Sequence, residues 1–136
     1  DEPAAQKPQA KRQLNKIPTV SQNRIVLVDV EAVTMIRAEG HYTWVSTAQG
    51  ASFCNLNISD IADRLDGASF MRVHRSYLAN LDYAEQILRE EGKVGLKLRG
   101  DNTVVPVARS SVPLLMERLG ISEHDGKAVG PRTIPG

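Results

Sequence analysis

Short runs of β-branched and aromatic residues recur along this chain, and glycine, asparagine or aspartate separates many of them. Runs of this length, bounded by turn residues, predict β-strands that pair through hairpins. They occupy Arg24–Val30, Val33–Ala38, Tyr42–Ala48, the segment 50–56, Phe70–Val73 and a meander over Tyr83–Ala108 with turns at Glu91-Gly92 and 100–102. The pattern therefore predicts a mainly β fold.

Two segments depart from strand periodicity and predict short helices. In the segment 57–67 apolar residues recur at helical spacing, with Asn57 as a suitable N-cap and Gly67 as a terminator. The segment Arg109–Gly120 is the second, and Pro113 suits its first turn. One or two short helices are thus expected beside the strands.

The length of 136 residues suits one domain with tails. Residues 1–16 are polar and basic and predict a linker or arm, residues 17–121 form the expected domain, and residues 122–136 predict a flexible C-terminal tail. Because the first residue is Asp1 rather than Met, the chain is expected to be part of a longer protein.

A single cysteine, Cys54, rules out an internal disulfide and fits a reducing compartment. No apolar run approaches the length needed to cross a bilayer. The expected location is the cytoplasm.

The charge is unevenly distributed. Residues 1–24 carry five Lys or Arg against two acidic residues, a net +3, whereas residues 25–120 carry ten against twelve, a net −2. The body therefore lacks the diffuse positive surface of a generic nucleic-acid binder. If it binds nucleic acid, a few placed side chains must do so, with help from the basic arm.

Polar turns directly follow three of the predicted strands, at Gly40-His41, at 74–76 and at 109–111. Arginine presents a planar fork that matches guanine O6 and N7, and histidine can donate to a base or a phosphate. Tyr42, Ser76 and Ser110 could contact phosphates. On residue type alone, simple solvation is the better explanation, because exposed arginine and histidine in turns are usually just solvated.

Other chemistries find little support. His74 and Ser76 could share a strand face, with Asp82 as a third member, but no strained nucleophile turn is present. The histidines at 41, 74 and 124 lack metal-ligand spacing, and no phosphate-binding glycine motif occurs. We expect no enzyme and no cofactor in this segment, and we expect His74 to be a core or turn histidine bonded to backbone.

The order of three motifs is more informative than any one of them. The stretches "IRAEGHYTWV", "FMRVHRSYLANL" and "VPVARS" resemble, in order and spacing, the LytTR DNA-binding domain of bacterial transcription regulators. The resemblance covers about residues 17–121. It implies an elongated fold of small, mostly antiparallel sheets that inserts loops rather than a helix into successive major grooves.

By position, the resemblance places the base-reading residues at His41, Arg75 and Arg109. It implies that His74 shapes a turn and that Ser76 and Ser110 touch phosphates. Ala108 departs from the family pattern, in which serine is common before the final arginine, and this change removes one phosphate contact at most.

The phrases "NRIVLVD", "GHYTWV" and "CNLNISDIADRLD" are most similar to LytTR domains of carbon-monoxide-responsive regulators. That similarity implies an upstream sensor in the same chain, which would hold any cofactor, either as a haem-binding domain or as a sensor tethered to the inner membrane. Duplex DNA with repeated half-sites and a homodimeric full-length protein are the expected partners. The competing hypothesis is a protein-interaction module that binds a peptide by β-strand addition.

Overall fold

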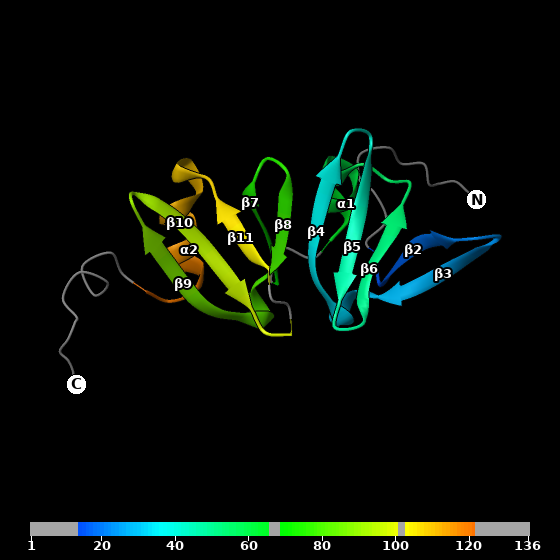
Figure 1. Ribbon diagram of the computed structural model, residues 1–136, viewed down its shortest axis with the longest axis horizontal. Helices are drawn as coiled ribbons and strands as arrows, with labels where there is room; N and C mark the ends of the chain where they lie inside the picture. Colours follow the sequence, from blue (N-terminus) through cyan, green and yellow to red (C-terminus); the bar gives the residue numbers. More distant parts are fainter. Residues whose placement is uncertain (1–13, 66–68, 101–102, 122–136) are drawn as a thin grey trace.

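The computed structural model describes residues 14–65, 69–100 and 103–121. Within them the strands form two antiparallel sheets, which lie side by side along the long axis of the molecule (Figure 1). The mainly β prediction is confirmed. The tail 122–136, most of the arm 1–16, the expected terminator Gly67 and two residues of the 100–102 turn lie outside the described residues.

The larger sheet has seven strands in the order β3-β2-β6-β5-β4-β8-β7. They are β2 (Lys16–Ser21), β3 (Arg24–Asp29), β4 (Val33–Glu39), β5 (Tyr42–Thr47), β6 (Gly50–Cys54), β7 (Phe70–His74) and β8 (Tyr77–Asn80). The pairing of β4 with β8 brings together segments far apart in sequence, with Ile36 opposite Leu78.

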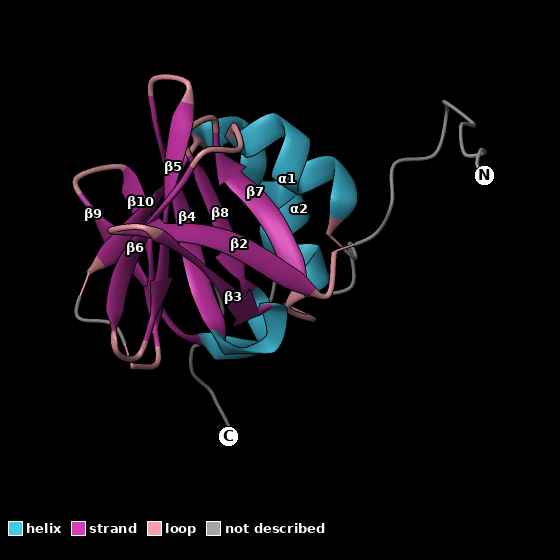
Figure 2. Cartoon of the chain, turned by 90° about the vertical axis from the view of Figure 1, so that its right-hand side faces the viewer, coloured by secondary structure: helices cyan, strands magenta, loops and turns pink. Residues whose placement is uncertain are grey.

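The smaller sheet has three strands in the order β11-β10-β9. They are β9 (Ala84–Glu90), β10 (Lys93–Leu98) and β11 (Val104–Val107). Two helices, α1 (Ile58–Arg64) and α2 (Val112–Arg118), lie on the same side of the strands (Figure 2), and three 3₁₀ turns, η1 (Val30–Ala32), η2 (Leu81–Tyr83) and η3 (Arg109–Ser111), connect other elements. No described helix has the length and apolar character needed to span a bilayer.

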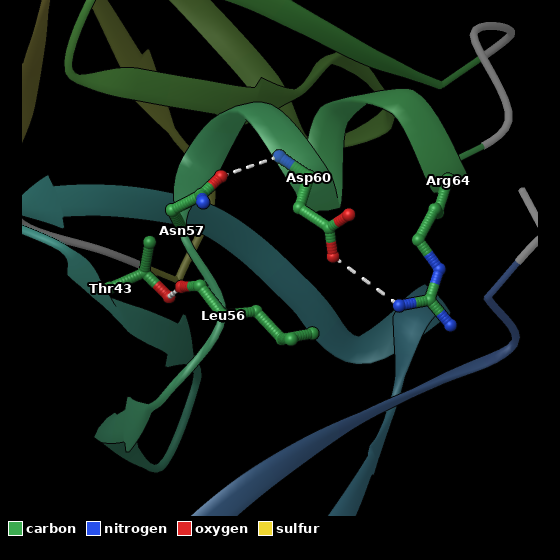
Figure 3. Close-up of polar contacts among 5 residues, drawn as sticks. All are labelled: Thr43, Leu56, Asn57, Asp60 and Arg64. Atoms are coloured by element: carbon green, nitrogen blue, oxygen red, sulfur yellow. Dashed lines mark hydrogen bonds and ion pairs between the residues drawn. The ribbon is translucent and has the colours of Figure 1, made fainter.

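Helix α1 begins where the sequence predicts. The side chain of Asn57 accepts a hydrogen bond from the backbone N–H of Asp60 at 2.7 Å, and Asp60 pairs with Arg64 one turn later at 3.4 Å (Figure 3). The Thr43 hydroxyl of β5 donates to the Leu56 carbonyl at 3.1 Å, which ties the segment before the helix to the sheet (Figure 3). The N-cap prediction is confirmed.

Several element boundaries differ from the prediction by one or a few residues, and two of them have a clear structural cause. The first predicted strand ends at Asp29 rather than Val30, because the Val30 N–H donates to the Asn15 carbonyl at 3.0 Å and Val30 opens η1. The segment Arg109–Gly120 starts as a 3₁₀ turn and becomes α-helical only at Val112. Pro113 lies in the first turn of α2, as expected.

Two buried apolar clusters hold these layers together. The first lies between α1 and the larger sheet and includes Ile36, Ile61 and Leu78, all at most 2% exposed. The second joins both sheets to α2, and its buried members are Met35, Met71, Val73, Ala79, Leu96, Leu98, Val105, Val107 and Leu115. Because the second cluster spans the junction, it fixes the end of β11 relative to β7 and β8.

The edge strand β3 is unusually apolar on its surface. Ile25, Val26 and Leu27 are 69%, 42% and 59% exposed. This strand is the outermost strand of the larger sheet. It pairs with β2 in a hairpin that projects at the right of Figure 1.

Candidate nucleic-acid interface

The first polar turn joins β4 to β5 through the two-residue loop Gly40-His41. Gly40 has a φ of +67°, a conformation that glycine adopts without steric cost in tight hairpins. His41 is exposed, and Tyr42 is 38% exposed with its ring 4.8 Å from that of Phe53. The loop therefore presents the imidazole beyond a strand end that aromatic packing supports.

Glu39, at the end of β4, is the acidic residue nearest this turn in sequence. Its Oε1 accepts hydrogen bonds from Trp44 Nε1 at 2.7 Å and from Arg37 Nη1 at 3.2 Å. The ion pair with Arg37 offsets a carboxylate charge that would otherwise repel phosphate.

The second polar turn joins β7 to β8 through Arg75 and Ser76. Arg75 is exposed and Ser76 is half-buried. The backbone N–H of Ser76 donates to His74 Nδ1 at 3.1 Å, and the His74 ring meets the Tyr77 ring edge-on at 5.5 Å. The expectation that His74 is a turn histidine bonded to backbone is confirmed.

The third polar turn follows β11, where η3 leads into α2. Arg109 and Ser110 are exposed, and the exposed Pro113 follows them in α2. Within η3 the Ser111 N–H donates to the Ala108 carbonyl at 2.8 Å, and the Val112 N–H donates to the Arg109 carbonyl at its C-terminal cap.

Backbone hydrogen bonds connect the three turns to one another. The Ala38 N–H donates to the Ser76 carbonyl at 2.8 Å, which joins the first turn to the second. The Ala108 N–H donates to the Val73 carbonyl at 2.7 Å, which joins the third to the second. In Figure 1 the three turns lie along the upper edge of the molecule. We call the surface formed by 40–42, 75–76 and 109–110 the loop edge.

The loop edge gathers every residue that the sequence singles out as a base or phosphate contact. Of these side chains, His41, Tyr42, Arg75, Arg109 and Ser110 are exposed, and Ser76 is the one that is half-buried. The chemistry of the edge is that of two planar cationic forks, one imidazole and several hydroxyls, which suits phosphates and base edges.

Sequence reasoning misses one residue whose side chain contacts the backbone of the loop edge. Arg72, in β7, donates from Nη2 to the Arg75 carbonyl at 2.5 Å. A long donor side chain three residues before a turn is a signal that could have drawn attention to it. The contact itself depends on the local backbone path, which the sequence pattern does not specify.

The fold is an antiparallel β domain with two short helices, and its three polar turns lie along one edge. The sequence matches the LytTr DNA-binding domain family over residues 23–120, and the chain belongs to this family. The family consists of DNA-binding domains, which supports DNA binding over the peptide-binding alternative.

Relatives and a solved structure agree with this assignment. The chain is 35% identical over 120 residues to the haem-containing CO-sensing transcriptional regulator RcoM 1 of Paraburkholderia xenovorans, covering 88% of this chain and 45% of the relative. It is 37% identical over 109 residues to the CO-responsive transcriptional regulator RcoM of Rhodospirillum rubrum, covering 79% and 46%. It is 29% identical over 116 residues to the transcriptional regulatory protein BtsR of Escherichia coli K12, covering 84% and 47%.

The chain thus spans slightly less than half the length of these relatives. Its fold matches that of a LytTr DNA-binding domain from Bacillus cereus with a TM-score of 0.71 at 19% identity, over 79% of this chain and 99% of that one.

Proposed function

We propose that the loop edge reads the major groove of duplex DNA, with His41, Arg75 and Arg109 contacting bases. Tyr42, Ser76 and Ser110 hold phosphates and fix the register. The observation that carries this proposal is the pair of backbone hydrogen bonds that link the three turns, from Ala38 to Ser76 and from Ala108 to Val73. Turns linked in this way move as one unit, so their side chains can meet one duplex together.

Placed contacts, rather than bulk charge, supply the affinity. The segment 25–120 has a net charge of −2, so a non-specific electrostatic mode is weak. Each bidentate arginine–guanine pair contributes about 1–3 kcal/mol of discrimination. Contacts that depend on the base sequence should therefore supply a large part of the binding free energy.

The test begins with selection of duplexes from a randomised pool by the 136-residue chain. Affinity for the enriched duplex is then compared with affinity for a scrambled duplex. Arg75→Ala should weaken specific binding by about 1–3 kcal/mol and relax the preference at one base pair. Enrichment of no sequence, or equal losses on both duplexes, would contradict base reading by this residue.

Residues 17–121 form the DNA-binding unit in this proposal, and the basic segment before it adds phosphate contacts. A single copy with a weakly charged body binds modestly. Two copies on repeated half-sites gain affinity because the second binding event becomes intramolecular. The parent regulator therefore acts as a homodimer in the cytoplasm, where its target DNA lies.

Two of the relatives described above are named as carbon-monoxide regulators. We infer that the parent protein responds to carbon monoxide through a sensor domain that lies upstream of these 136 residues in the same polypeptide and holds any haem. A Soret shift on carbon monoxide addition to the full-length protein, together with a change in its DNA affinity, would support this. No spectral response would contradict it without affecting the DNA-binding proposal.

A further inference from the structure

The peptide unit that joins Arg75 to Ser76 is held at both of its polar ends by side chains from β7. Its carbonyl, on Arg75, accepts from Arg72 Nη2 at 2.5 Å, and its N–H, on Ser76, donates to His74 Nδ1 at 3.1 Å. The next carbonyl, that of Ser76, accepts from the Ala38 N–H at 2.8 Å. The plane of this peptide is thereby fixed, and so is the direction in which the Arg75 side chain leaves the backbone.

Arg72 is itself anchored at its other end. Its Nη1 donates to the Ser59 hydroxyl in α1 at 3.1 Å. The guanidinium therefore bridges the helix and the turn, which a lysine cannot do because its ammonium lacks a planar fork.

Arg72 holds this position at a cost to the fold. Its Nε is buried, and among the described residues it has no hydrogen-bond partner. An unsatisfied buried donor carries a desolvation penalty. Sequences break this rule mainly where function requires it, so the arrangement indicates a role for Arg72 beyond stabilising β7.

A β-bulge makes the geometry available. In the β7–β8 pair Arg72 lies opposite Leu78 while His74 lies opposite Tyr77, so the register shifts at Val73. Bulges redirect side chains and free backbone groups. Here the Val73 carbonyl accepts from Ala108, and Arg72 and His74 both reach the turn.

We propose that Arg72 is a positioning residue that sets the orientation in which Arg75 meets its base. The inference rests on the proposed function of Arg75. Arg72 acts through the Arg75 carbonyl rather than by touching DNA. Without the Arg72 side chain, Arg75 should still reach the duplex, but the turn that carries Arg75 must then become ordered on binding.

The test uses Arg72→Met, which keeps most of the side-chain length and removes all donors, including the unsatisfied Nε. The variant should keep the wild-type circular dichroism spectrum and a cooperative thermal transition. Its affinity for the selected duplex should fall about three- to tenfold, as expected for one side chain that must be ordered on binding. Base preference should relax at the same base pair that Arg75→Ala affects, with an unchanged salt slope.

The double variant separates positioning from direct contact. In an Arg75→Ala background, Arg72→Met should add less than about a twofold loss, because the residue it positions is gone. A loss of the same size in both backgrounds, with a salt slope reduced by about one, would show that Arg72 is a phosphate contact and would overturn the proposal.

Ser59→Ala covers the case in which Arg72→Met does not fold, because it removes only the outer anchor on an exposed helix residue. It should produce a smaller loss confined to the same base pair. Wild-type base preference in Ser59→Ala and Arg72→Lys would overturn the positioning role. If Arg75→Ala itself leaves base preference unchanged, the proposed function of Arg75 fails instead, so the two failures are distinguishable.

Discussion

The backbone N–H of Ala108 lies 2.7 Å from the carbonyl of Val73, so the segment that carries Arg109 is bonded to β7, the strand that leads into the turn of Arg75. Val73 and Ala108 are far apart in sequence: Val73 lies in β7 of the larger sheet, and Ala108 directly follows β11 of the smaller sheet. This bond and the Ala38–Ser76 bond make a single surface from three turns. Simultaneous contact of all three turns with one DNA duplex requires that surface.

Arg109→Ala should weaken binding to the selected duplex by about 1–3 kcal/mol and relax one base position, because it removes one planar fork. That position should differ from the one affected by Arg75→Ala. Fluorescence anisotropy with single-base duplex variants measures both effects. The matched control is Arg24→Ala, another exposed arginine, located on the β2–β3 hairpin away from the loop edge. Similar losses for Arg24→Ala and Arg109→Ala would indicate a general charge effect.

Asn57→Ala should lower the free energy of unfolding by about 1 kcal/mol, because the Asp60 N–H loses its cap. Chemical denaturation measures the change. Asn55→Ala, at an exposed position just before the helix, serves as the control and should have little effect. DNA affinity at a temperature where both variants are folded should match that of the wild type. A stability unchanged by Asn57→Ala would argue against this cap.

Asn80→Ala should lower the free energy of unfolding more than Asn57→Ala does. Asn80 has this structural role although it belongs to the same motif, "FMRVHRSYLANL", as Arg75. Asn80 is 2% exposed, donates from Nδ2 to the Val33 carbonyl at 2.8 Å and accepts from the Asp82 N–H at 3.0 Å. Its removal leaves buried backbone groups unsatisfied, at about 1–3 kcal/mol each. Thermal unfolding should show a clear decrease in Tm. A loss of DNA affinity without any decrease in Tm would contradict this structural role.

Deletion of residues 1–13 should reduce affinity equally for selected and scrambled duplexes. This segment contains Lys7, Lys11 and Arg12, and each phosphate contact contributes about 0.9 to the slope of log K against log salt. The deletion must stop there, because the Leu14 N–H donates to the Arg64 carbonyl at 2.7 Å and Lys16 begins β2. An unchanged salt slope would show that the segment does not contact DNA.

Most strands could be predicted from local sequence, because each strand's apolar residues and turn signals lie within a few positions. Strand β2 could not be singled out, since Pro18 interrupts its apolar run. Pro18 lies opposite Leu27 and is tolerated within the β2–β3 pair. The end of β3 at Asp29 depends on a bond from Val30 to Asn15, which no local pattern specifies.

The motifs predict the residues of the loop edge, and the family resemblance implies that the three turns face one duplex, but the bonds that join the turns could not be predicted. The joining of the turns depends on the Ala38–Ser76 and Ala108–Val73 bonds, and no periodicity encodes pairings of such separation. The proposed role of Arg72 could not be predicted either, because it depends on a bulge at Val73 that no local pattern specifies.

The most direct measurement is a titration of the ¹⁵N-labelled chain with the selected duplex, followed by amide chemical shifts. Contact through the loop edge predicts that amides at 40–42, 75–76 and 109–111 shift together at the same DNA ratio. The chemical shifts of the amides at 22–23, in the β2–β3 turn, should not change. Shifts confined to one of the three turns, or concentrated on β3, would contradict the claim that the three turns bind one duplex as a unit.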